Sequence, residues 1–288
     1  MKILIPITLT ALLCAPLVNA EPPEPPKGMK WVLQEDFSDE FNGNKLDKKK
    51  WNDTYPGWTG RAPGWFNPKA IKVKDGTLQI RSGVLKEPKG PYTMYGGAVT
   101  SKSDEAYFGY YEVRVKASRI KMSTTFWLSN HKVPYVWTDC GSDTYSTELD
   151  ILECVGGSLD SENPGMRKKM NSNTHFRYVE CGAEKEKFYS KGAKKELSSE
   201  VWEEFHTYGA WWVDENHVRF YADDEFFECV HVSTEIHPTP FDRGMHINMV
   251  TETYNWQPPP TPEELENPDI NTAYYDWVRS WKLVPVDG

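Results

Sequence analysis

The sequence predicts an all-β sandwich. Apolar and polar residues alternate strictly from Tyr110 to Lys116, which places Tyr111, Val113 and Val115 on one face of a strand. Other segments with strand character follow at short intervals: 77–81, 205–213, 217–221, 226–232 and 245–251. Turn residues separate these segments at 75–76, 214–216 and 223–224. Many short strands joined by such turns are typical of a β-sandwich.

One short helix is predicted near the C-terminus. Thr261 has the character of an N-cap, Pro262 suits the first helical position, and Glu264 completes a capping box. No repeat, low-complexity boundary or second linker interrupts the chain after Trp31. We therefore expect one domain over residues 31–288.

The first twenty residues have the pattern of a secretory signal peptide. Lys2 supplies the positive start, residues 3–18 are largely apolar, and Val18-Asn19-Ala20 offers small residues for cleavage. A polar, proline-rich linker over residues 21–30 follows. We expect the mature chain to be periplasmic or secreted.

Two alternatives to this interpretation of residues 1–20 remain. An uncleaved anchor is one, but Pro6 and Pro16 interrupt a stretch that is already short for a membrane span. A lipoprotein signal at Cys14 is the other, although Leu13 stands where a smaller residue is expected. The rest of the chain contains no apolar stretch long enough to cross a bilayer.

Charge and cysteine content exclude some classes of protein. The chain has 33 Lys and Arg against 42 Asp and Glu, a net charge of −9 that becomes −10 without Lys2. General nucleic-acid binding needs a basic field and is not expected. Four cysteines lie beyond the signal: Cys140, Cys154, Cys181 and Cys229. Their spacing does not suit a zinc site; in an oxidising compartment they allow three disulfide pairings, and buried thiols are the alternative.

The segment 146–154 combines carboxylates with strand character. In a regular strand Glu148 and Asp150 share one face and Leu149 lies on the other, so Glu153 would point the wrong way. A β-bulge at 151–152 would return Glu153 to the face of the other two carboxylates. The sequence thus predicts three carboxylates on one face of a sheet, with Leu149 in the core behind them.

Such a trio suits the hydrolysis of glycosides. Close carboxylates raise one another's pKa, so one can be protonated while another is ionised. Retaining glycosidases need this pair about 5–5.5 Å apart, one carboxylate as nucleophile and the other as acid/base. Glu148 and Glu153 could fill these roles, with Asp150 between them. A solvated acidic edge and a calcium site are the alternatives that spacing alone leaves open.

The motif Glu148-x-Asp150-x-x-Glu153 resembles that of glycoside hydrolase family 16, in the subgroup with a bulged catalytic strand. The resemblance extends over nearly the whole chain, through 37–43, 96–102, 108–116, 125–128, 205–212 and 275–279. It implies a β-jelly roll of two curved antiparallel sheets with an open cleft on the concave face. By position it implies Glu148 as nucleophile, Asp150 as its assistant and Glu153 as acid/base.

The C-terminal segments 251–256, 261–268 and 276–279 resemble the branch that acts on red-algal galactans, the agarases and porphyranases. Agarases carry Trp-x-Gly-Pro early in the chain, whereas this sequence has Trp58-Thr-Gly-Arg61. The resemblance to porphyranases implies that Arg61 meets a galactose 6-sulfate, and a guanidinium can bind such a group bidentately. The acidic chain attracts a sulfated polymer poorly, so Arg61, Lys69 and Arg177 would have to act at short range. A surface ion pair is the alternative role for Arg61.

The chain has 12 Trp and 15 Tyr, and flat aromatic rings suit both sugar platforms and a β-sandwich core. The candidate platforms are Trp58, Trp65, Trp127, Trp137 and Trp256. His175 is a candidate hydrogen-bonding partner of substrate near the acid/base, and Glu252 is a candidate polar contact. By resemblance, Glu40, Gly43 and Asp276 are candidate positions for a structural calcium ion on the convex face. No catalytic metal or organic cofactor is implied.

The sequence therefore predicts a monomeric endo-hydrolase that cleaves β-1,4 linkages of a red-algal galactan, porphyran before agarose. Two other classes remain open: a carbohydrate-binding protein on the same fold without activity, and a calcium-stabilised surface protein. The intact carboxylate trio argues against a pure binder, which has no use for the repulsion between like charges.

Overall fold

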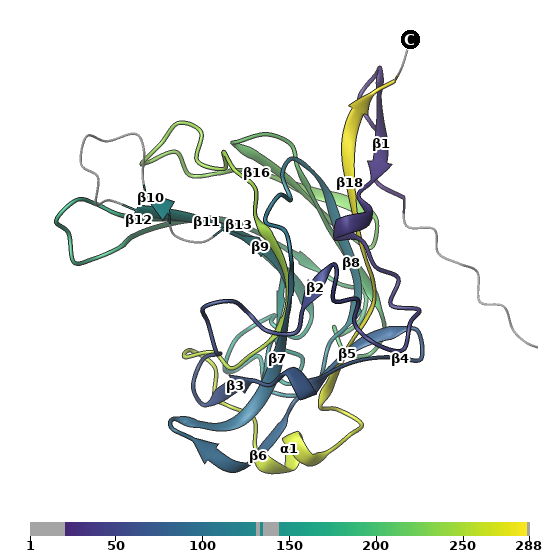
Figure 1. Ribbon diagram of the computed structural model, residues 1–288, viewed down its shortest axis with the longest axis vertical. Coiled ribbons are helices and arrows are strands. Elements are labelled where there is room, and N and C mark those ends of the chain that lie inside the picture. The colour runs from purple at the N-terminus through teal and green to yellow at the C-terminus, as the bar shows by residue number, and fades with distance from the viewer. Residues whose placement is uncertain (1–20, 131–132, 135–143, 287–288) are drawn as a thin grey trace, which may run out of the picture.

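The computed structural model describes residues 21–130, 133–134 and 144–286, and these form two packed β-sheets (Figure 1). The first sheet has the order β16 (Glu225–His231), β15 (His217–Ala222), β14 (His206–Trp212), β8 (Gly109–Lys116), β18 (Thr272–Pro285), β5 (Thr77–Arg81) and β4 (Ile71–Lys74), with β1 (Met29–Leu33) beside β18. Pairing within it is antiparallel throughout.

The second sheet carries the acidic strand. Its order is β13 (Lys187–Glu196), β12 (Lys169–Val179), β11 (Thr144–Cys154), β9 (Thr124–Ser129), β17 (His246–Thr251), β7 (Tyr92–Ser101) and β2 (Trp51–Asn52). Three shorter strands lie beside this path: β10 (Val133–Pro134) on β11, and β3 (Gly64–Phe66) and β6 (Gly83–Lys89) on β7. Only β3 pairs in parallel among these strands.

The core lies between the two sheets because each contributes one apolar face. Tyr111 and Val113 of β8 and Leu149 of β11 are fully buried in the same cluster. The Tyr275 hydroxyl of the first sheet donates a 2.9 Å hydrogen bond to the Thr125 carbonyl of the second. The other face of the second sheet is therefore free to carry polar side chains.

The predicted all-β sandwich is confirmed, and each predicted strand segment contains a strand. The predicted helix is α1 (Pro262–Glu266), whose N-cap Thr261 and Glu264 form both bonds of the capping box. Two 3-10 turns, η1 (Glu35–Phe37) and η2 (Pro68–Ala70), complete the elements. β1 begins at Met29, so the last two residues of the predicted linker belong to the sheet.

The cysteines divide into two kinds. Cys154 is a buried free thiol and Cys229 an exposed one, whereas Cys181 is in a disulfide bond. Cys140 lies outside the described residues. Within the part of the chain that the structure describes, no helix has the length and apolar character needed to cross a membrane.

Candidate active site

A bulge in β11 brings the three carboxylates to one face. The register of β11 against β12 and β9 shifts between Asp150 and the following residues, where the sequence predicts the bulge. Ile151 and Leu152 are both buried in the core, and Glu153 turns back to the polar face. Glu148, Asp150 and Glu153 consequently line one pocket of about 490 Å³.

The neighbouring strand β12 faces this trio with a ladder of alternate residues. Asn171, Asn173, His175 and Arg177 pair in register with Glu153, Asp150, Glu148 and Ser146 respectively. Alternation along a strand puts all four on the same face. Each carboxylate therefore has polar side chains beside it on β12.

Arg177 binds Glu148 through both nitrogens of its fork. Its Nη1 and Nη2 donate hydrogen bonds of 3.1 Å each to the two carboxylate oxygens. A bidentate guanidinium fixes both the position and the orientation of a carboxylate. The two hydrogen bonds therefore fix the Glu148 carboxylate in position, and the guanidinium compensates its charge. A carboxylate that acts as nucleophile would have to be fixed in this way.

Asp150 is the most enclosed member of the trio, with 4% of its surface exposed. Burial raises its pKa well above the ordinary aspartate value, and the neighbouring charges of Glu148 and Glu153 raise it further. His175 Nε2 lies 2.8 Å from Asp150 Oδ2 and 3.8 Å from Glu148 Oε1. Burial also lowers the pKa of His175, which favours the neutral form of the ring.

Glu153 differs from Glu148 in its surroundings. Burial raises its pKa above the ordinary glutamate value, while a hydrogen bond from Tyr254 opposes the shift. The Tyr254 hydroxyl donates to Glu153 Oε1 at 2.9 Å, and Asn173 Nδ2 lies 3.5 Å from Oε2. Glu148 is paired with an arginine whereas the pKa of Glu153 is raised, and such a difference can separate a nucleophile from an acid.

Arg61 reaches the same pocket from a loop far away in sequence. Its Nε donates a 3.1 Å hydrogen bond to Glu252 Oε2, and its guanidinium carbon lies 5.7 Å from the ring centres of both Trp58 and Tyr254. Among the described residues nothing accepts a hydrogen bond from its two terminal nitrogens. Arg61 is 38% exposed at the side chain, so this free edge is open to a ligand.

Glu252 is the hydrogen-bonding partner of Arg61. It is 5% exposed, and burial raises its pKa to about 7, although the Arg61 guanidinium acts in the opposite direction. The Glu252 carboxylate is therefore half protonated near neutral pH. Arg61 consequently faces a partner whose charge changes in the working range of most enzymes.

An aromatic wall flanks the carboxylates. Trp127 of β9 is opposite Asp150 in register and stacks on Tyr55 at 5.7 Å between ring centres. Tyr55 meets Trp58 edge to face at 5.3 Å, and Trp58 in turn packs on Phe66. Trp58 and Trp127 both line the catalytic pocket, as does Tyr55.

The other predicted platforms lie elsewhere. Trp256 is 50% exposed and stacks on Tyr254 at 4.3 Å, at the edge of the site. Trp65 lines a different hollow, which shares no lining residue with the catalytic pocket. Trp137 lies outside the described residues. His175 lies beside Asp150 and Glu148, and its contact with substrate stays a prediction.

The carboxylates at two of the candidate calcium positions are paired with arginines. Glu40 receives two hydrogen bonds from Arg279, and Asp276 forms an ion pair with Arg114. Calcium takes carboxylate and backbone carbonyl oxygens, so Glu40, Gly43 and Asp276 stay a prediction for a structural ion.

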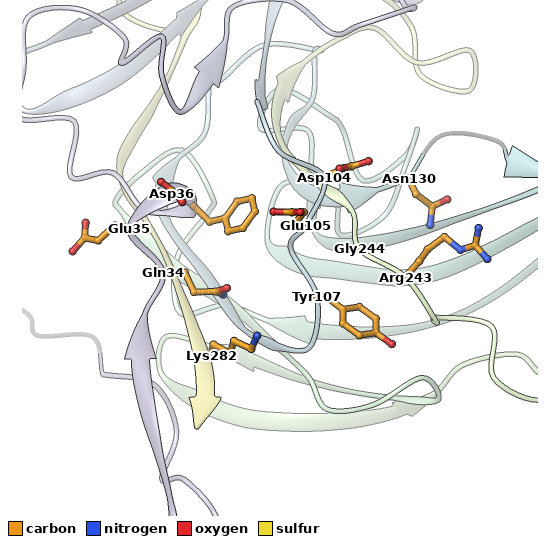
Figure 2. Close-up of a pocket in the computed structure, with 11 residues that line it drawn as sticks. Gln34, Glu35, Asp36, Asp104, Glu105, Tyr107, Asn130, Arg243, Gly244 and Lys282 are labelled. Atoms are coloured by element: carbon orange, nitrogen blue, oxygen red, sulfur yellow. The ribbon is translucent and has the colours of Figure 1, made fainter. Parts of the chain in front are cut away.

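Another hollow is lined by none of the three carboxylates (Figure 2). It measures about 970 Å³ and lies beside η1 and the approach to β8. Charges of both signs line it: Glu35, Asp36, Asp104, Glu105, Arg243 and Lys282. Asn130 is the one lining residue that it shares with the pocket of the carboxylate trio. Its volume alone therefore does not make it the site of glycoside hydrolysis.

The sequence did not single out Tyr254 and Asn173 as partners of the acid. Asn173 could have been found from alternation, because it lies two residues before His175 on the same strand. Tyr254 could not, since its segment leaves β17 at Thr251 and its contact with Glu153 joins residues 101 positions apart.

Comparison with known proteins agrees with the family that the sequence motif indicates. The family model described as "Beta-porphyranase A-D, GH16 domain" matches residues 31–283. This chain belongs to that family. Its relatives include β-porphyranase E of Zobellia galactanivorans, 44% identical over 91% of each chain. β-Porphyranase B of Phocaeicola plebeius is 43% identical over 92% of this chain and 88% of the relative.

Solved structures agree with this family membership. The β-porphyranase of the gut bacterium Bacteroides plebeius superposes with a TM-score of 0.84 at 43% identity, over 92% of this chain and 96% of that one. Agarases are more distant in sequence: the extracellular agarase of Streptomyces coelicolor is 27% identical over 91% of this chain and 87% of its own. The chain is thus a family 16 glycoside hydrolase with the predicted jelly-roll fold.

Proposed function

We propose that this chain is a secreted, retaining endo-hydrolase that cleaves the β-1,4 galactosidic linkages of porphyran. The family match over residues 31–283 and the porphyranase relatives support the substrate class. The single observation that carries the proposal is the free edge of Arg61 beside the carboxylate trio. It offers an anion site where a sulfated sugar would lie during cleavage.

The geometry supports a double displacement. Glu148, placed by Arg177, attacks the anomeric carbon while Glu153 gives its proton to the departing glycosidic oxygen. The bond to the leaving sugar breaks and a glycosyl ester on Glu148 forms. Glu153, now ionised, then takes a proton from water as that water attacks the ester carbon. Both carboxyl groups return to their starting states, and the anomeric configuration is retained.

Asp150 lies between the two glutamates in β11 and is almost fully buried. Its raised pKa favours the protonated form, which adds no third negative charge to the trio and can donate a hydrogen bond. We therefore assign Asp150 the role of positioning the nucleophile.

Arg61 supplies the preference for sulfate. Its Nε donates to Glu252, which leaves the two terminal nitrogens available to a ligand in the pocket that Arg61 lines. A sulfate can accept two parallel hydrogen bonds from such an edge. Trp58 and Tyr254, in contact with the guanidinium, fix its position. This local site can act in an acidic chain because solvent ions screen distant charges beyond about 8–10 Å.

The test compares reducing-sugar release by the mature chain on porphyran and on desulfated agarose. We expect faster cleavage of porphyran, lost with Glu148→Ser and reduced about tenfold or more with Arg61→Ala. Arg119→Ala is a matched control, since Arg119 also stacks on a tryptophan, Trp202, but outside the pocket. Faster cleavage of agarose, with no effect of Arg61→Ala, would contradict sulfate recognition and leave the hydrolase assignment intact.

A further inference from the structure

A second hollow of about 840 Å³ is lined by residues of β3, η2, β6 and β7. The strands β3 and β6 lie near the bottom of Figure 1. Trp65 and Tyr95 contribute its aromatic surface, and Lys69, Lys86 and Lys89 contribute positive charge. None of its lining residues lines the catalytic pocket. The proposed reaction makes no use of this surface.

The alternation of β3 explains why Trp65 faces this hollow. Phe66 is buried and packs on Trp58, in the aromatic cluster of the catalytic wall. Trp65, its neighbour in the strand, must point to the opposite side. Two adjacent aromatic residues therefore serve two different surfaces.

Tyr95 lines the hollow and lies across from Gly83 on the facing strand. A β-carbon at Gly83 would lie 2.4 Å from the Tyr95 hydroxyl oxygen, so a larger residue there would force the Tyr95 side chain to shift. Glycine at position 83 therefore leaves room for the ring in its present position.

The charge of this surface is opposite to that of the chain as a whole. Three lysines and Glu87 line it, all exposed, whereas the net charge of the chain is −9. Lys89 Nζ lies 3.4 Å from the centre of the Trp65 ring. An ammonium and an aromatic face are therefore available at the same point.

We propose that this hollow is a second, non-catalytic binding site for the sulfated galactan. An aromatic face stacks on the apolar face of a sugar ring, and ammonium groups pair with sulfate esters. On binding, the sugar displaces Lys89 from the Trp65 ring, and the freed ammonium pairs with a sulfate. The proposal rests on the proposed function, because it takes the substrate polymer as the occupant.

A second site of this kind acts through effective concentration. A polymer bound at Trp65 keeps the rest of its length near the cleft, so that a second contact becomes intramolecular. The benefit exists for long chains and disappears for oligosaccharides that fill only the cleft. The hollow in Figure 2 offers no such site, because four of its charged lining residues are acidic.

The experiment uses affinity electrophoresis of the Glu148→Ser chain in gels that contain porphyran or desulfated agarose. We expect the double variant Trp65→Ala/Lys89→Ala to raise the apparent Kd for porphyran roughly threefold or more, with a smaller change for agarose. Arg219→Ala/Phe226→Ala is the matched control, since Arg219 lies 4.7 Å from the Phe226 ring on the other sheet. In the chain with Glu148 intact, the double variant should lower kcat/KM on polymer more than on a short oligosaccharide.

Retardation equal to that of the parent chain would overturn the proposal. An equal loss on polymer and oligosaccharide would also overturn it, because Trp65 would then belong to the cleft. If the parent chain neither cleaves porphyran nor is retarded by it, the proposed function itself fails. If the parent chain cleaves porphyran but the double variant is retarded as strongly as the chain without these two substitutions, the proposal of a second site fails. The proposed function then still stands.

Discussion

We expect Glu252 to make the proposed recognition of sulfate depend on pH. Burial raises its pKa to about 7, and its partner is Arg61, the cation proposed to meet the sulfate. Below pH 7 Glu252 is mostly neutral and the charge of Arg61 is fully available to a ligand. Above pH 7 the Glu252 carboxylate compensates Arg61, so affinity for a sulfated sugar should fall as pH rises.

The magnitude follows from linkage. A bound sulfate adds a negative charge near Glu252 and so favours its protonated form, which means that binding takes up a proton. Affinity can then fall by at most about tenfold for each pH unit above the pKa of the free enzyme. Between pH 6 and pH 8 we expect Kd for a sulfated oligosaccharide to rise roughly five- to tenfold.

Glu252→Gln isolates this effect. The amide oxygen still accepts from Arg61 Nε, but the side chain no longer titrates. Titration calorimetry on the Glu148→Ser background, from pH 5.5 to 8.5, should show a flatter profile for the Gln variant. A neutral agarose oligosaccharide serves as control, because its binding does not need the charge of Arg61. The same pH slope in both chains would refute the reasoning.

Three further predictions concern the trio and the fold. Glu148→Ser should reduce kcat on porphyran at least about a thousandfold without lowering the melting temperature, since Glu148 lies outside the core; retained activity would disprove its role. Tyr254→Phe removes a hydrogen bond that lowers the pKa of Glu153, so the alkaline limb of the kcat/KM profile should move to higher pH. An unmoved limb would show that Glu153 is not the acid. Glu112 is fully buried with a pKa of about 8, raised mainly by burial, so the unfolded chain loses this proton at lower pH than the folded one. Stability should therefore fall between about pH 4.5 and pH 8, by as much as about 5 kcal/mol from this group. Glu112→Gln should remove that slope in urea unfolding, and a slope unchanged in the variant would contradict it.

The β-sandwich and the bulged strand could be predicted because both depend on local patterns. Alternation marks the strands, and the spacing of Glu148, Asp150 and Glu153 requires one extra residue in β11 if all three share a face. The structure has the bulge at that point. The side chains that act on these carboxylates were less accessible to sequence reasoning.

Long-range pairing accounts for most of what the sequence did not show. Arg61 and Glu252 are 191 residues apart, and no local pattern indicates that they meet. The faces of β3 follow from alternation, but sequence alone does not say which face meets the cleft, so Trp65 was predicted there. The resemblance suggested Glu40 and Asp276 for calcium without indicating that arginines occupy both.

The bulge in β11 also bears on how such a chain can change over generations. A deletion of one residue at 151–152 would remove the bulge and bring the glutamate to the second position after Asp150. In a regular strand that position lies on the same face as Glu148 and Asp150, so the acid would keep its place on the polar face. One deletion therefore joins the bulged and the regular form of the strand without a step that turns the glutamate into the core. The extra residue and the bulge are gained or lost together, and the carboxylate trio can persist through either change.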